Sequence, residues 1–65
     1  MLTPAEQEAR VLEYARERGQ ITNRECQQVC GLGPYQASRL LSRLSNAGKL
    51  HVVGAGRSRA YIVPE

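Results

Sequence analysis

The fold of this chain is decided by residues 21–48, which read ITNRECQQVCGLGPYQASRLLSRLSNAG. Near the start of this stretch, Thr22 and Glu25 have the spacing of a capping box, in which two side chains bond each other's backbone at a helix start. Gly31 is a typical helix end. A short helix is therefore predicted over residues 23–30, and at this length it needs packing against other elements to be stable.

The second half of the stretch predicts a longer helix over residues 34–47. Pro34 suits the first helical position, Gly33 can serve as the N-cap, and Gly48 is a typical stop. Apolar residues recur at the spacing of one helix face, at Ala37, Leu40, Leu41, Leu44 and Ala47. This periodicity is the clearest in the chain, and it predicts that one face of the helix is buried.

Toward the N-terminus, residues 4–18 predict a further helix. Thr3 and Glu6 form a second capping box at its start. Its apolar positions, spaced as on one helix face, are Ala5, Ala9, Val11, Leu12 and Ala15. Ile21, between this helix and the next, is expected to be extended and to offer a third strand to a sheet.

Toward the C-terminus, residues 50–53 and 60–63 read as two strands rich in β-forming residues, joined by the turn at residues 54–59. The element order is then helix, short strand, helix, tight turn, helix and hairpin, which is the order of a winged helix-turn-helix. We expect a mostly α fold with a small β part (α+β), formed by one domain over residues 1–65.

Length and composition narrow the class of protein. The chain has 65 residues, of which 42% are apolar and two are cysteines. Such a chain builds one small core, and two cysteines cannot make a multi-bridge secreted scaffold. No apolar run approaches the roughly 18 residues of a membrane span, and the N-terminus lacks the features of a signal peptide. We therefore expect a cytoplasmic protein without a membrane partner.

Charge is distributed unevenly along the chain. Residues 1–32 carry four arginines and five glutamates, whereas residues 33–65 carry five basic residues and one acid, Glu65. A basic half favours a polyanionic partner such as nucleic acid. The alternative is that a net charge of +3 serves only solubility.

The stretch from Ile21 to Val63 resembles the winged helix-turn-helix domain of bacterial regulators, and in particular the C-terminal domain of transcriptional regulators related to the RecG helicase. The resemblance rests on Ile21-Thr22-Asn23-Arg24-Glu25, Arg39, Leu41, Leu44, Gly48, Leu50, Gly54, Gly56, Arg57 and Tyr61. It departs at Gly33-Pro34, where the family often has Ser and Arg. The resemblance implies that the chain is a double-stranded DNA-binding module of a larger transcription regulator.

On a helical wheel of about 100° per residue, the side of residues 34–47 away from the apolar stripe holds the candidate DNA-binding residues Tyr35, Gln36, Ser38, Arg39, Ser42, Arg43 and Asn46. A helix-turn-helix places this face in the major groove. Arg39 is the candidate for guanine readout, and Gln36, toward the side, could read adenine. Ser38, Arg43 and Lys49 are candidates for phosphate contacts. The alternative is a solvated polar face.

The hairpin tip is the second candidate DNA contact. Arg57 and Arg59 lie beside Gly54 and Gly56, which would let the backbone approach a phosphate. Arginine in such a wing can also enter a narrow minor groove. The alternative is a mobile, charged tip that keeps the sheet edge soluble.

No catalytic, cofactor or metal site is predicted, and the chain is not expected to be an enzyme. Cys26 and Cys30 share a helix face, but a zinc site needs four ligands and His51 is the one further strong candidate. Buried cysteines usually pack as small apolar groups, so a core role is favoured over metal or redox chemistry.

Two other functions remain open: protein–protein interaction, and binding of left-handed DNA or RNA. The second is disfavoured because the winged helices that bind Z-DNA have Asn and Tyr where this chain has Ser38 and Ser42. As an isolated domain the chain is expected to be a monomer.

Overall fold

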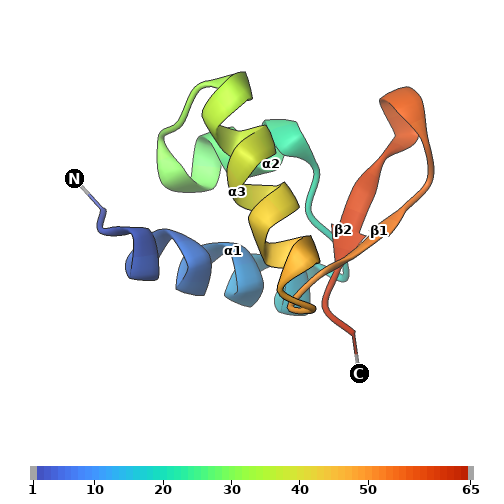
Figure 1. Ribbon diagram of the computed structural model, residues 1–65, viewed down its shortest axis with the longest axis horizontal. Coiled ribbons are helices and arrows are strands. Elements are labelled where there is room, and N and C mark those ends of the chain that lie inside the picture. The colour runs from blue at the N-terminus through green and yellow to red at the C-terminus, as the bar shows by residue number, and fades with distance from the viewer. Residues whose placement is uncertain (1, 65) are drawn as a thin grey trace.

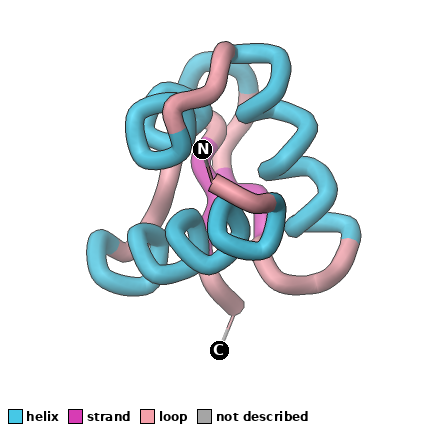
Figure 2. Tube along the Cα trace, turned by 90° about the vertical axis from the view of Figure 1, so that its left-hand side faces the viewer, coloured by secondary structure: helices cyan, strands magenta, loops and turns pink. Residues whose placement is uncertain are grey.

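The computed structural model describes residues 2–64, and within them three helices are followed by a two-stranded antiparallel hairpin (Figure 1). The elements are α1 (Pro4–Arg18), α2 (Asn23–Cys30), α3 (Pro34–Asn46), β1 (His51–Val53) and β2 (Ala60–Ile62). A single 3-10 turn, Gly56–Ser58, forms the tip of the hairpin. Figure 2 shows the three helices in front of the strands. The expected α+β winged-helix layout is confirmed.

The predicted capping boxes form at the starts of α1 and α2. The Thr3 amide donates to Glu6 Oε1 at 3.1 Å and the Glu6 amide donates to Thr3 Oγ1 at 3.2 Å. In α2 the Thr22 amide donates to Glu25 Oε1 at 2.9 Å, and the Glu25 amide donates to Thr22 Oγ1 at 3.3 Å. Each box satisfies amides at a helix start that have no partner inside the helix.

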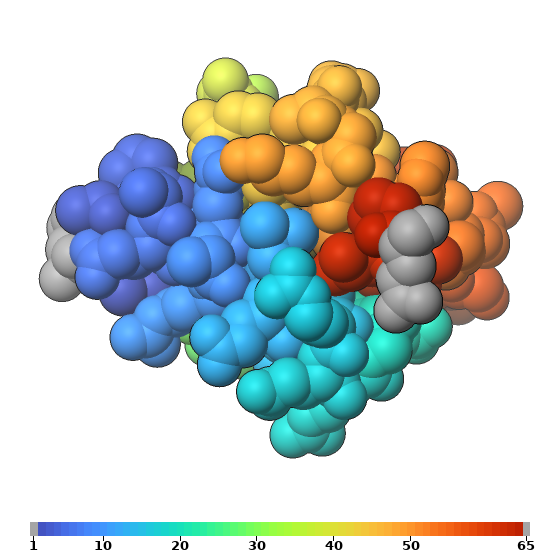
Figure 3. All heavy atoms as spheres, turned by 90° about the horizontal axis from the view of Figure 1, so that it is seen from below, coloured from blue at the N-terminus to red at the C-terminus, as the bar shows by residue number. Residues whose placement is uncertain are grey.

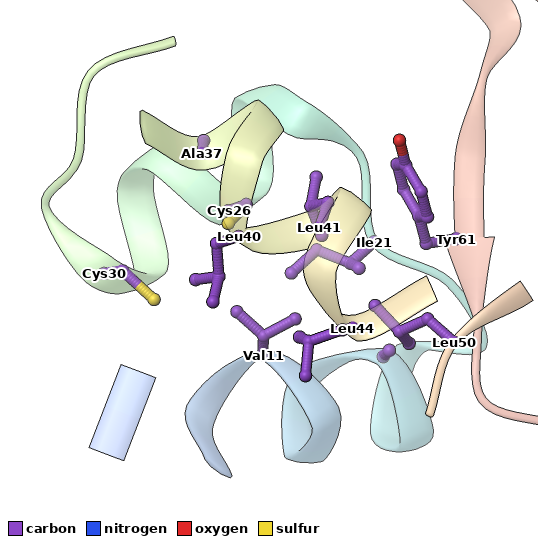
Figure 4. Packing of buried hydrophobic residues seen from close by; sticks show 11 residues of the cluster. Val11, Ile21, Cys26, Cys30, Ala37, Leu40, Leu41, Leu44, Leu50 and Tyr61 are labelled. Atoms are coloured by element: carbon purple, nitrogen blue, oxygen red, sulfur yellow. The ribbon is translucent and has the colours of Figure 1, made fainter. Parts of the chain in front are cut away.

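The core lies where the three helices and the base of the hairpin meet (Figure 4). In Figure 4, Val11 of α1 points toward the leucines of α3, and Leu50 lies beside Leu44. The buried cluster consists of Val11, Ala15, Ile21, Cys26, Cys30, Ala37, Leu40, Leu41, Leu44, Leu50 and Tyr61. The leucine stripe predicted for α3 is therefore its buried face.

The predicted apolar face of α1 is confirmed in the second half of the helix and is wrong at its start. Ala5 and Ala9 are exposed, whereas Val11 and Ala15 are buried. The reason is that alanine has little apolar surface to bury, so the larger side chains decide which side of the helix packs. Val11 occupies the centre of the packed face.

The end of α3 also differs from its prediction. The helix ends at Asn46 rather than residue 47, and Ala47 is an exposed cap outside the buried stripe. Gly48 adopts a φ of 80°, and the amide of Lys49 donates to the Leu44 carbonyl at 2.9 Å. This left-handed turn ends the helix, and the next buried residue along the chain is Leu50.

Each strand is one residue shorter than predicted, at the end away from the hairpin tip. β1 pairs with β2 in the register His51↔Ile62, Val52↔Tyr61 and Val53↔Ala60. Leu50 is a buried core residue preceding β1. Ile21 contributes the expected third strand as a single bridge: it exchanges two backbone hydrogen bonds of 2.8 Å with Tyr61. The hairpin is thereby attached to the link between α1 and α2.

A polar contact joins α1 to α2 at the edge of the core. The Tyr14 hydroxyl donates to Glu25 Oε2 at 2.8 Å, and the guanidinium carbon of Arg18 lies 5.4 Å from the centre of the Tyr14 ring. The hydrogen bonds from the Tyr14 hydroxyl and the Thr22 amide lower the pKa of Glu25, whereas the bond to Glu25 raises the pKa of Tyr14.

We predict that Leu44→Ala will be strongly destabilising. Leu44 is 1% exposed, and truncating a buried leucine costs about 2–5 kcal/mol. A domain of this size has about 3–10 kcal/mol of stability, so the variant should be largely unfolded at room temperature. The free energy of unfolding, measured with urea, should fall much less for Leu12→Ala, because Leu12 is only half-buried. Equal losses would contradict the assigned core.

We also predict that Glu25 stabilises the fold more when it is ionised than when it is protonated. Because its folded pKa lies below the ordinary 4.5, its contribution is complete above that value and is lost as pH falls through the folded pKa. Glu25→Gln keeps an acceptor for the capping bonds but loses the charge that strengthens them, so it should cost about 1 kcal/mol at pH 7, and the difference from wild type should shrink at about pH 3. Urea titrations at both pH values measure this. A difference that does not change with pH would refute the assignment.

Candidate nucleic-acid interface

The first turn of α3 is anchored to α2 by Asn23 and is capped by the side chain of Gln36. Asn23 Nδ2 donates to the carbonyl of Pro34 at 3.2 Å, and the Gly33 amide donates to Gln36 Oε1 at 3.4 Å. The side-chain oxygen of Gln36, a candidate for adenine readout, is thus engaged at the N-terminus of the helix. Its amide nitrogen has no hydrogen bond within residues 2–64.

Tyr35 and Arg39 form a pair on the exposed face of α3. Tyr35 is 72% exposed, and the guanidinium carbon of Arg39 lies 5.8 Å from the centre of its ring. Residues four apart on a helix are neighbours, and a guanidinium near an aromatic face is attracted to it. The two candidates therefore present one combined aromatic and cationic surface.

A groove runs between α3 and the hairpin and brings other candidates together. It is lined by Ser42, Ser45, Asn46, Val52, Gly54, Arg59 and Tyr61. One wall supplies hydroxyls and an amide from α3, and the other supplies the guanidinium of Arg59 and an apolar strand surface. These groups can bond phosphates and pack against sugars. The predicted site residues do not include Ser45, Val52 or Tyr61. Ser45 lies outside the wheel sector opposite the core, and Val52 and Tyr61 read as ordinary strand residues.

A second groove lies on the opposite flank of α3, toward α1. Arg39 and Arg43 line it with Gln7, Leu32, Gln36 and Leu40. The exposed face of α3 is thus bordered by grooves on both sides, with two arginines on one and Arg59 on the other. Ser38 is exposed but lines neither groove.

The hairpin tip is shaped by backbone bonds rather than by an open turn. The Ser58 amide donates to the Ala55 carbonyl at 3.1 Å, and the Arg59 amide donates to the Gly56 carbonyl at 3.3 Å. Arg57 and Arg59 are both exposed. Gly54 has a φ of 75°, and a Cβ at this position would lie 2.5 Å from the Ser58 carbonyl oxygen. Its role in the structure is to let the tip close on itself.

Lys49 lies apart from the other candidates. Its ammonium is 3.3 Å from Glu8 Oε1 of α1. Figure 3, seen from below, shows the blue surface of α1 beside the orange surface of the segment that follows α3. The structure therefore places Lys49 at a contact between elements rather than in either groove beside α3.

The remaining basic residues of the second half have no acidic partner within residues 2–64. The Lys49–Glu8 pair is the one salt bridge in this part of the chain. Arg39 and Arg43 are four residues apart on α3, a spacing at which like charges repel. These arginines therefore form a surface whose positive charge is not neutralised by carboxylates of the described residues.

The two cysteines belong to the core. Cys26 is fully buried, and Cys30, with its thiol 3.6 Å from the Gln7 carbonyl oxygen, is nearly so. Burial raises the pKa of Cys26 to about 12 and also raises that of Cys30. Among residues 2–64 no three metal-binding side chains gather at one place. Both thiols are thus held in the unreactive protonated form at neutral pH.

Comparison with known proteins supports the fold and no more. The DIP2311 protein from Corynebacterium diphtheriae contains a region that superposes on this chain with a TM-score of 0.87 at 24% sequence identity. The match covers 95% of this chain and 11% of that protein. No family model and no curated protein sequence matches the chain. Within residues 2–64, none of the helices has the length and apolar character needed to cross a membrane.

We predict that the two tip glycines respond differently to alanine. Gly54→Ala combines a positive φ with a contact of 2.5 Å to backbone, so the tip must rearrange. Gly56→Ala has a φ of 57° but no atom within 4 Å, and we expect only the cost of the left-handed conformation, about 1 kcal/mol. Backbone amide chemical shifts should change throughout residues 54–60 in the first variant and only beside the substitution in the second. Similar changes in both would contradict the described tip.

Proposed function

We propose that this chain is a double-stranded DNA-binding module of a bacterial transcription regulator. In this proposal α3 lies in the major groove of the duplex, and the hairpin acts as a wing on the minor groove or the phosphates. Arg39 reads bases, and Arg43, Arg57 and Arg59 contact phosphates.

The observation that carries the proposal is the common surface formed by α3 and the wing. The groove between them holds hydroxyl and amide groups on one wall and Arg59 on the other. Residues 33–64 contain no acidic residue, so no carboxylate among them repels a phosphate backbone. Arginines without carboxylate partners bind phosphates without first breaking an ion pair.

The regulator role rests on the resemblance of the sequence to winged domains of bacterial regulators. In those proteins the winged domain is one part of a longer chain. We infer that this domain likewise positions a larger regulator on DNA, as a monomeric unit. The similarity in fold to a small region of a larger protein is consistent with such a modular use.

Protein binding is a second candidate function, and three exposed side chains favour it. Tyr35 is 72% exposed, Val52 is 49% exposed and Val53 is 36% exposed. Aromatic and apolar groups in solvent are typical of protein interaction surfaces. Tyr35 lies against Arg39 and Val52 shares a groove with Arg59, however, and these arginines favour an anionic partner.

We predict that the wing contributes salt-dependent binding. Arg57→Ala/Arg59→Ala should weaken binding to all duplexes alike and should reduce the slope of log Kd against log salt by about one unit per lost contact. Arg39→Ala should cost about 1–3 kcal/mol on a preferred duplex and less on random DNA. Fluorescence polarisation of labelled duplexes between about 50 and 200 mM salt measures both.

The matched control is Arg10→Ala/Arg16→Ala, which removes the same charge from exposed positions of α1. We expect this control to change the affinity much less than the wing variant does. Circular dichroism checks the fold of every variant. Duplex affinity that is unchanged in both the wing variant and Arg39→Ala would refute DNA binding and favour the protein-binding alternative.

A further inference from the structure

An aromatic side chain stands in solvent at the start of α3. Tyr35 is 72% exposed, and the guanidinium of Arg39 lies against it at 5.8 Å. The ring is absent from the buried cluster and its partly buried neighbours. Folding therefore does not explain why an aromatic residue occupies this position.

The backbone beneath the ring is held by α2. Asn23 Nδ2 donates to the Pro34 carbonyl at 3.2 Å, and the side-chain Nε2 of Gln27 in turn donates to Asn23 Oδ1 at 2.6 Å. Proline also restricts the φ angle at the first position of α3. Tyr35 follows directly, so its ring projects from a well-anchored first turn.

The ring reduces the freedom of the arginine beside it. A long side chain loses rotamer entropy when it is ordered against a ligand, and this loss weakens binding. A guanidinium already resting on an aromatic face loses less. Arg39 then presents its planar fork in a defined position, as bidentate bonding to the O6 and N7 atoms of guanine requires.

The spacing of the two groups suits neighbouring base pairs. Successive base pairs are separated by about 3.4 Å along the helix axis, and their edges are also offset sideways by helical twist. The ring and the guanidinium, 5.8 Å apart, are therefore close enough to contact two neighbouring base pairs at the same time. The apolar feature of the major groove is the C5 methyl group of thymine, against which an aromatic ring can pack.

We propose that Tyr35 and Arg39 read a guanine and an adjacent thymine as one unit. Arg39 bonds the guanine. Tyr35 positions Arg39 and covers the thymine methyl group. This inference rests on the proposed function, because it requires α3 to lie in the major groove of DNA.

The first experiment selects bound sequences from a pool of random duplexes. Wild type and Tyr35→Phe should both enrich guanine beside thymine, because phenylalanine keeps the ring. Tyr35→Ala should bind the selected duplex about two- to fivefold more weakly and should enrich thymine poorly. Arg43→Ala is the matched control, since it removes an arginine one turn later without a ring partner; it should weaken binding without changing the selected sequence.

The second experiment replaces the selected thymine by uracil, which removes only the methyl group. Wild type should lose about fourfold in affinity. Tyr35→Ala should bind both duplexes equally, because the group that contacts the methyl is gone. A structural role of Tyr35 alone would lower affinity for both duplexes and leave their ratio unchanged.

Three results would overturn the inference: a wild-type pool without guanine beside thymine, the same selected sequence for Tyr35→Ala and wild type, or equal wild-type affinity for the thymine and uracil duplexes. In each case salt-dependent duplex binding would still uphold the proposed function. If wild type binds no duplex at all, the proposed function fails and this inference fails with it. Circular dichroism verifies that each variant is folded.

Discussion

The burial of the leucine stripe of α3 is the constraint on which the rest of the structure depends. Leu40, Leu41 and Leu44 are each at most 2% exposed, and a chain of 65 residues has room for one small core. Because an α-helix has 3.6 residues per turn, burying this stripe sets the rotation of α3 about its axis. The side chains on the opposite face of α3 are then left in solvent. The candidate interface is therefore the face of α3 that does not pack against the core.

The same core holds the wing in place. Two strands of three residues each are too little for an independent hairpin. Tyr61 anchors them by packing in the core and by its two backbone bonds with Ile21, and Leu50 buries the chain just before β1. The groove between α3 and the hairpin therefore keeps its shape because both of its walls are fixed to the same core.

The two halves of the chain use their charges differently. Glu6 and Glu25 cap helices, Glu25 also accepts a bond from Tyr14, and Glu8 pairs with Lys49. Several acids of the first half are thus engaged in holding the helices together. The arginines of the second half lack such partners among the described residues, and they lie on the surface that the core leaves open. Folding and the proposed recognition draw on separate sets of charged side chains.

Local signals in the sequence determined the helix starts and the exposed face of α3. Thr3 and Thr22 cap through bonds to residues three positions later, and the face follows from helical periodicity, so neither needs distant contacts. Only the tertiary structure decided that Ala5 is exposed, that Lys49 meets Glu8 and that Ser42 shares a groove with the wing. These three features depend on packing between segments that are far apart in the chain. The spacing of residues within one segment does not determine how that segment packs against another.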